Sequence, residues 1–166
     1  MGGMSNNYHR PSWDEYFLKI CEIVGSRGTC DRGRSGCVVV KNKQILTTGY
    51  VGSPTGLPHC DEVGHEMSTY SYDNGEKPSQ HCIRTAHAEQ NAIVQAAKIG
   101  VALEGGTMYA NMVPCYACTK MIINAGIARV VCNKDYHAGK RSKEIFEIAG
   151  VKLEIINKEI ETYDKM

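Results

Sequence analysis

The chain has 166 residues, which is room for about one domain, and its 42% hydrophobic and 22% charged residues exclude disordered and fibrous classes. Nineteen Lys and Arg residues against eighteen Asp and Glu residues give a net charge of +1, so no broad cationic field is available to hold a long nucleic acid. The longest apolar runs, such as Cys37–Val40, have about four residues where a membrane span needs about twenty, and we expect no membrane insertion.

The first residues, 1–11, are polar and lack the cationic and apolar stretches of a signal peptide. We expect a flexible N-terminal segment here and a cytoplasmic protein. Eight cysteines in a chain without an export signal indicate metal ligands, catalysis or reduced thiols rather than a disulfide framework.

The first predicted element is a helix. Ser12 begins a capping-box pattern, and apolar residues recur at helical spacing over Trp13–Val24. Two β-branched runs follow, Gly36–Val40 and Gln44–Tyr50, joined across Asn42-Lys43. This pattern predicts an antiparallel hairpin with a tight turn.

The stretch from Val51 to Arg84 is rich in Gly, Pro, Ser, Asp and His, and its apolar residues follow neither helical nor strand periodicity. This composition predicts a long loop that something must hold in place. After it, helical and strand patterns alternate, as is typical of parallel βαβ units. The expected elements are helix His87–Lys98, strand Thr107–Asn111, helix Cys115–Ala125, strand Arg129–Cys132, helix Ser142–Ala149 and strand Lys152–Ile156. We therefore expect a single α/β domain over residues 12–166.

Two short motifs begin helices at one edge of the predicted sheet, His87-Ala88-Glu89 and Pro114-Cys115-Tyr116-Ala117-Cys118. The first helix and the strand after it have matching lengths of about 16–17 Å, so that helix starts beside the end of the strand, where the next helix begins. His87, Cys115 and Cys118 can therefore converge. Two thiolates and an imidazole suit a tetrahedral Zn²⁺ ion that keeps one open position.

Such an ion lowers the pKa of a bound water from about 15.7 toward about 7, which supplies a hydrolytic nucleophile at neutral pH. Glu89 lies elsewhere around the first helical turn and suits a proton shuttle better than a metal ligand. The alternative is a redox pair of Cys115 and Cys118, but a redox pair leaves His87 and Glu89 unexplained.

The two motifs together resemble those of the zinc-dependent nucleobase deaminases. Within that superfamily, Arg84–Ile93, Gly49-Tyr50-x-Gly52-Ser53-Pro54 and His59-Cys60-Asp61 are similar to the deoxycytidylate (dCMP) deaminases, over about Ser12 to Ile156. The resemblance implies a three-layer α/β/α cytidine-deaminase-like fold, with a mixed five-stranded sheet flanked by helices.

The resemblance also implies an activity, hydrolytic deamination of dCMP at C4 of cytosine to dUMP and ammonia, which supplies dUMP for thymidylate synthesis. Glu89 would protonate N3 and then the leaving amine. The backbone of Ala88 and the ring of Tyr136 would contact the base, and Arg32 would hold the 5′-phosphate. The alternatives are a partly buried core aromatic for Tyr136 and a solvated surface charge for Arg32.

Regulation is implied in the same way. Family members are commonly homohexamers, activated by dCTP with Mg²⁺ and inhibited by dTTP through a segment that corresponds here to Gly49, Tyr50 and Gly52. The family usually has Asn where this chain has Val51, so we expect altered regulation, although backbone contacts by the glycines do not depend on that side chain.

A second set of metal-binding residue types remains in and beside the long loop. Some related deaminases carry a structural zinc in these regions, and a metal that closes such a loop offsets its ordering entropy. The preferred ligand set is Cys30, Cys60, His65 and His81, with Cys82 as the substitute. The alternative is solvated histidines and free core thiols, as we expect for Cys21, Cys37 and Cys132.

Two other functions share these motifs. A tRNA or single-stranded nucleic-acid deaminase has both, and the near-neutral charge argues against it. A catalytically inactive, zinc-stabilised interaction protein would have no use for Glu89.

Overall fold

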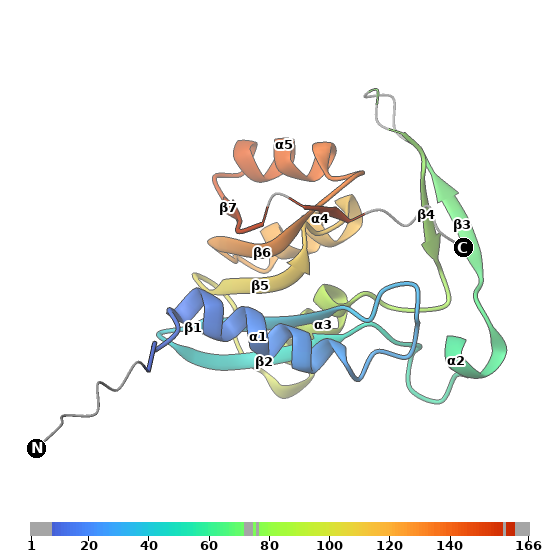
Figure 1. Ribbon diagram of the computed structural model, residues 1–166, viewed down its shortest axis with the longest axis horizontal. Helices are drawn as coiled ribbons and strands as arrows, with labels where there is room; N and C mark the ends of the chain where they lie inside the picture. Colours follow the sequence, from blue (N-terminus) through green and yellow to red (C-terminus); the bar gives the residue numbers. More distant parts are fainter. Residues whose placement is uncertain (1–7, 72–74, 76, 158, 162–166) are drawn as a thin grey trace, which may run out of the picture.

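The computed structural model describes residues 8–71, 75, 77–157 and 159–161. Figure 1 labels its helices and strands along the chain. They are α1 (Trp13–Gly25), β1 (Gly36–Lys41), β2 (Gln44–Tyr50), α2 (Cys60–Val63), β3 (Met67–Tyr70), β4 (Ser79–Cys82), α3 (Ala88–Ile99), β5 (Thr107–Met112), α4 (Tyr116–Asn124), β6 (Arg129–Tyr136), α5 (Lys140–Ile148), β7 (Lys152–Ile155) and β8 (Ile160–Glu161).

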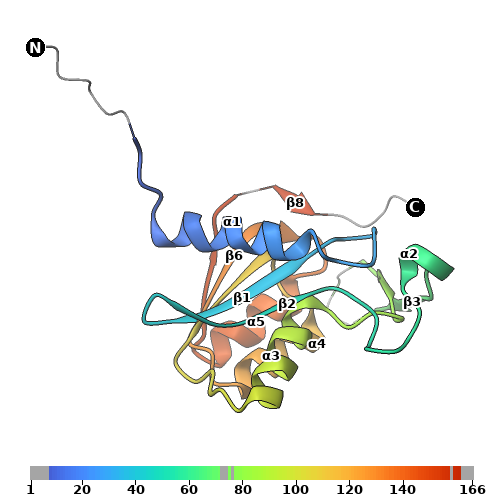
Figure 2. The same cartoon turned by 90° about the horizontal axis from the view of Figure 1, so that it is seen from below.

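The main sheet has the strand order β2-β1-β5-β6-β7. β1 is antiparallel to both of its neighbours, and β5, β6 and β7 are parallel to one another. Figure 2 shows α1 on one face of this sheet and α3, α4 and α5 on the other. The predicted three-layer fold with a mixed five-stranded sheet is confirmed.

The first helix and the hairpin form for local reasons. The Ser12 hydroxyl accepts the Glu15 N–H at 3.2 Å, and the Glu15 carboxylate accepts the Ser12 N–H at 2.7 Å, which closes the predicted capping box. Asn42 and Lys43 have φ values of 52° and 63°, the left-handed pair that a two-residue hairpin turn needs. Both predicted elements are confirmed.

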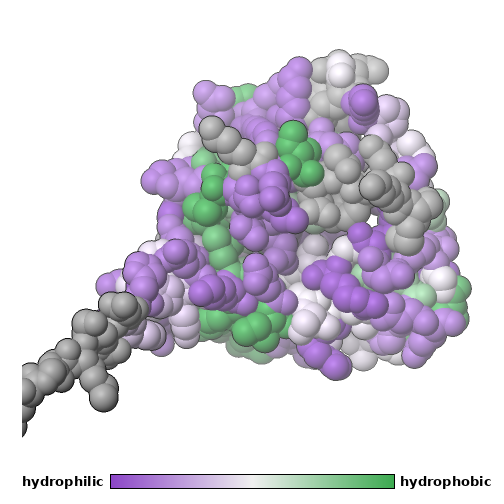
Figure 3. Space-filling model, in the orientation of Figure 1, coloured by the Kyte–Doolittle hydropathy of each residue, from purple (hydrophilic) through white to green (hydrophobic). Residues whose placement is uncertain are grey.

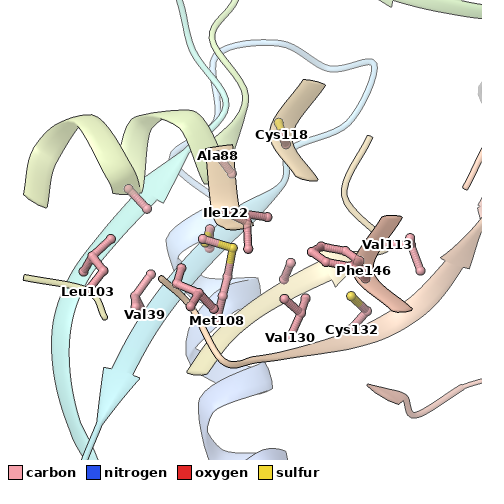
Figure 4. Packing of buried hydrophobic residues seen from close by; sticks show 14 of the residues in the cluster. Val39, Ala88, Leu103, Met108, Val113, Cys118, Ile122, Val130, Cys132 and Phe146 are labelled. Atoms are coloured by element: carbon pink, nitrogen blue, oxygen red, sulfur yellow. The ribbon is translucent and has the colours of Figure 1, made fainter. Parts of the chain in front are cut away.

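Side-chain alternation along the strands divides the core between the two faces of the sheet. Val38 and Tyr109 pack with Phe17 under α1. On the opposite face, Val39 and Met108 belong to a larger cluster beneath α3, α4 and α5, which Figure 4 shows. Full burial of such an apolar side chain contributes about 1.5–3 kcal/mol, so the sheet is held from both sides.

The prediction of an irregular loop over residues 51–84 is wrong in part. The segment contains the short helix α2 and an antiparallel pair of strands, β3 and β4, that lies apart from the main sheet. β4 consists of Ser, Gln, His and Cys, so it has no apolar alternation to reveal it. β6 also runs on to Tyr136, beyond its predicted end, and pairs there with the unpredicted β8.

Two further predictions concern the domain bounds and membrane insertion. Residues 1–7 of the predicted N-terminal segment lie outside the described residues, and the single domain over 12–166 stays a prediction. In the part of the chain that the structure describes, no helix is long and apolar enough to cross a membrane. On the face in Figure 3, hydrophobic side chains form small separate areas among hydrophilic ones.

An ion-pair network ties α1 to β6 and β7. The Arg129 guanidinium donates to both carboxylate oxygens of Asp14 at 2.9 and 2.7 Å and also pairs with Glu154, and the Tyr109 hydroxyl donates to Asp14 at 2.7 Å. The hydrogen bond from Arg129 holds the pKa of Asp14 below its ordinary value. This pairing therefore stabilises the fold above the unfolded pKa of about 3.9 and is lost as the pH falls through the folded pKa.

Asp14→Asn is expected to lower the free energy of unfolding by about 1–3 kcal/mol at pH 7, because Arg129 loses one of its two charged partners while the side chain at position 14 keeps its size. Urea unfolding of both proteins between pH 7 and pH 3 measures the effect. The difference between them should shrink below about pH 4. A difference that does not change with pH would contradict the role of the Asp14 charge.

Candidate active site

Three metal-binding side chains meet where α3 and α4 begin. His87 is the residue before α3 and Cys115 the residue before α4, both in extended conformation, and Cys118 lies in the first turn of α4. The His87 Nδ1 atom is 3.4 Å from each of the two Sγ atoms. The convergence expected from the βαβ topology is therefore present.

These distances fit a shared zinc ion. With Zn–S bonds of about 2.3 Å and Zn–N bonds of about 2.0–2.1 Å, tetrahedral geometry separates a sulfur and a nitrogen by about 3.6 Å. All three ligand atoms lie within 4.8 Å of one another, and among the described residues no fourth His, Cys, Asp or Glu joins them. The donor set suits zinc and leaves one coordination position for another molecule.

The pKa values of the two thiols are shifted in opposite directions. Hydrogen bonding with Cys118, and then with His87, holds the pKa of the Cys115 thiol well below its ordinary value. The same Cys115 neighbour, with burial, raises the pKa of Cys118. A divalent cation between the two sulfurs would allow both to be thiolates, the form that binds zinc.

Glu89 lies beside this cluster, in the first turn of α3, and only 7% of its surface is exposed. Burial raises the pKa of its carboxyl group above the ordinary value, although the His87 imidazole opposes the shift. A carboxyl group with a raised pKa holds a proton more readily than an ordinary one, which suits a general acid–base catalyst.

A pocket opens onto His87, Glu89 and Cys115, and a concave site with a few converging polar groups is typical of small-molecule binding. Its lining includes the three residues expected to contact substrate, namely Arg32 before β1, Ala88 at the start of α3 and Tyr136 at the end of β6. Tyr136 and Ala88 are almost fully buried. The structure therefore brings all three to the cluster.

The glycine-rich segment expected to bind effectors packs against α3. A Cβ on Gly49 would be 2.2 Å from the Ala88 carbonyl oxygen, so glycine lets β2 approach the helix. The Tyr50 carbonyl accepts a hydrogen bond from the Asn91 side chain at 2.7 Å, and Gly52 forms a β-bridge with Ala86.

A second cluster of metal-binding residues includes two residues of the pocket lining, Cys30 and Cys82. Cys30, Cys60, His65 and Cys82 have their ligand atoms within 4.8 Å of one another, and the three cysteines are buried. The Cys30 Sγ atom is 3.6 Å from His65 Nδ1, and the Sγ atoms of Cys60 and Cys82 are 3.5 Å apart. Four soft ligands with this spacing suit a closed zinc site.

The structure does not bring His81 into this second cluster, and Cys82, the predicted substitute, lies there instead. Adjacent residues of a strand point to opposite sides, so Cys82 and His81 of β4 face different partners. The His81 Nε2 atom lies 3.1 Å from the Ser79 hydroxyl and 3.5 Å from the Tyr136 hydroxyl, and its ring stacks on His87 at 5.6 Å.

The pocket lining also contains His81, which the sequence analysis assigned to the second cluster, and Asn111, which it did not single out. Asn111 stands near the end of β5, four residues before Cys115. Its signal was a polar side chain at the carboxyl end of a strand in an α/β sheet, where such folds bind ligands.

The chain matches the family model "Cytidine and deoxycytidylate deaminase zinc-binding region" over residues 11–134. It is 39% identical to ComE operon protein 2 of Bacillus subtilis, over 87% of this chain and 71% of that protein. It is 37% identical to the deoxycytidylate deaminase of Mycobacterium phage D29, over 76% of this chain and 98% of that protein. It spans less than half the length of the two yeast deoxycytidylate deaminases that it matches.

A solved structure shares the fold. The dCMP deaminase from the cyanophage S-TIM5, in a crystal structure with dCMP and dUMP, aligns with a TM-score of 0.71 and 28% sequence identity. The alignment covers 90% of this chain and 100% of that one.

Proposed function

This chain belongs to the cytidine and deoxycytidylate deaminase family, and we propose that it converts dCMP and water to dUMP and ammonia. It is a deaminase, a hydrolase of C–N bonds. The observation that carries the proposal is a buried carboxyl group, Glu89, that lines one pocket together with His87 and Cys115 of the three-ligand cluster. The solved relative with dCMP and dUMP supports the choice of substrate.

Zinc held by His87, Cys115 and Cys118 would supply a nucleophilic water at neutral pH. Glu89 takes up the proton of this water and delivers it to N3 of the cytosine as oxygen adds to C4. Glu89 then takes the proton of the hydroxyl group newly formed at C4 and carries it to the exocyclic amine. The C4–N bond breaks, and ammonia leaves as the C4 carbonyl forms. The raised pKa of Glu89 suits a group that must hold a proton between these two transfers.

The substrate contacts follow from the walls of the pocket. The backbone of Ala88 and the ring of Tyr136 contact the pyrimidine, because both line the pocket together with Glu89. Arg32, in the segment before β1, lines the same pocket, and its guanidinium suits the 5′-phosphate.

We further propose a structural zinc at Cys30, Cys60, His65 and Cys82. These ligands join the segment before β1, α2 and β4, so a metal there would hold the poorly patterned region of the chain in place.

Cys60→Ala is expected to lower the zinc content from about two ions per chain to about one. The midpoint of thermal unfolding should fall by about 4–8 °C, which corresponds to a loss of about 2 kcal/mol. The matched control is Cys37→Ala, which removes an equally buried thiol outside both clusters and should keep two ions. A wild-type protein with one zinc would contradict the second site.

The remaining proposals concern regulation, cellular location and metabolic role. A hexamer regulated by dCTP with Mg²⁺ and by dTTP would use Gly49, Tyr50 and Gly52, and the β-bridge from Gly52 to Ala86 links that segment to the residue before His87. Val51 in place of the family's Asn alters this regulation. The enzyme would act in the cytoplasm and supply dUMP for thymidylate synthesis.

Ammonia release from dCMP, CMP, deoxycytidine and a cytosine-containing oligonucleotide tests the proposed function. We expect turnover of dCMP and little from the others. Preference for the oligonucleotide would favour the single-strand deaminase, and no release from any would favour the inactive interaction protein.

A further inference from the structure

Asn111 takes the place of a backbone partner where β1 and β5 separate. The two strands pair from Val40 and Thr107 to Cys37 and Ala110. One residue further on, the Gly36 N–H donates instead to the side-chain oxygen of Asn111, with 2.6 Å between nitrogen and Oδ1. The amide side chain therefore fills the opening between the strands, next to the pocket.

This hydrogen bond orients the amide. A backbone N–H can only donate, so the side-chain atom that faces it is the oxygen, and the NH₂ group points away from Gly36. Gly36 itself packs closely against α1, since a Cβ on it would be 2.1 Å from the Cys21 carbonyl oxygen and 2.5 Å from the Gly25 nitrogen. The NH₂ group of Asn111 is thus held in a fixed direction.

The Asn111 NH₂ group has no hydrogen-bond acceptor among the residues that the structure describes, and Asn111 lines the pocket together with Glu89 and Tyr136. The side-chain amide of Asn91, by contrast, has acceptors within the protein. The Asn91 NH₂ group donates to the Tyr50 carbonyl at 2.7 Å and lies 3.4 Å from the Ala86 carbonyl. An oriented donor without a protein partner, in the wall of a ligand pocket, is suited to a ligand acceptor.

We propose that Asn111 is a specificity-determining residue that donates this hydrogen bond to an acceptor oxygen of the nucleoside part of the substrate, the base C2 carbonyl or a sugar oxygen. The inference rests on the proposed function. A neutral donor suits these oxygens, whereas the charged phosphate is better met by Arg32. Asn111 also lines the same pocket as Glu89 and Cys115, the residues assigned to the reaction at the base.

The test is Asn111→Asp, because aspartate keeps an acceptor oxygen for the Gly36 N–H and loses only the donor. Inhibition constants of dUMP and of uncharged deoxyuridine are measured as competitors of dCMP turnover. Both are expected to rise at least about tenfold, a factor equivalent to one lost hydrogen bond of about 1.4 kcal/mol. Asn111→Ser, which removes the amide, should show the same loss if Asn111→Asp does not fold.

Asn157→Asp is the matched control. The Asn157 Oδ1 atom also accepts a backbone N–H, from Glu159 at 3.1 Å, and it lies outside the pocket. This variant should leave both constants unchanged. A ligand with sulfur in place of the C2 oxygen distinguishes the two candidate acceptors. If Asn111 donates to the C2 carbonyl of the base, this exchange should weaken binding to the wild type more than binding to Asn111→Asp.

Unchanged constants in Asn111→Asp would show that Asn111 only joins β1 to β5, which overturns the inference. A rise for dUMP alone would indicate charge repulsion by the new carboxylate and would overturn it as well. Both results require a wild-type protein that is active on dCMP. A wild type without that activity would instead contradict the proposed function, and the inference would fall with it.

Discussion

Glu89→Gln is expected to lower kcat on dCMP by at least about a hundredfold while zinc stays bound. The amide keeps the volume of this buried side chain, so the fold and the ligand cluster are preserved, but it cannot shuttle a proton from water to N3 and then to the amine. Initial rates of ammonia release at saturating dCMP measure the effect, and atomic absorption measures the zinc.

Glu147→Gln is the control for this variant, because it makes the same chemical change on the exposed face of α5, outside the pocket. It should leave kcat unchanged. If Glu89→Gln retains wild-type kcat, the proton transfers belong to another group.

Cys118→Ala is expected to abolish detectable turnover and to lower the zinc content by about one ion per chain. Two of the three ligands remain, but a tetrahedral site with two protein ligands holds zinc far more weakly. Activity and zinc content should fall together, whereas a purely structural role of Cys118 would affect stability first.

Cys132→Ala separates ligand loss from cavity formation. Cys132 is as deeply buried as Cys118, on β6, and belongs to neither metal cluster. This variant should lose stability and keep its zinc and its kcat. If Cys118→Ala binds as much zinc as Cys132→Ala, then Cys118 is not a ligand.

Local chemistry explains how much of this structure can be predicted from the sequence. The capping box at Ser12 and the Asn42-Lys43 turn depend on neighbouring residues, and both elements formed as expected. The meeting of His87 with Cys115 depends on topology. Because α3 and β5 have similar lengths, the end of β5 must lie near the start of α3, which brings Cys115 close to His87. Regular α/β order therefore made the candidate active site predictable.

The features that escaped prediction depend on contacts between distant segments. β3 and β4 are short and polar, and only their pairing defines them as strands. That pairing decides that Cys82 rather than His81 faces Cys60. The place of Asn111 follows from the separation of β1 and β5, which no periodicity in either segment reveals.

Anomalous diffraction at the zinc absorption edge, from crystals of the zinc-loaded protein, tests the central claim most directly. We predict a peak within about 2.0–2.3 Å of His87 Nδ1 and the Sγ atoms of Cys115 and Cys118, with a non-protein atom in the fourth position. A fourth protein atom bound to that zinc, or no peak at these side chains, would contradict the account.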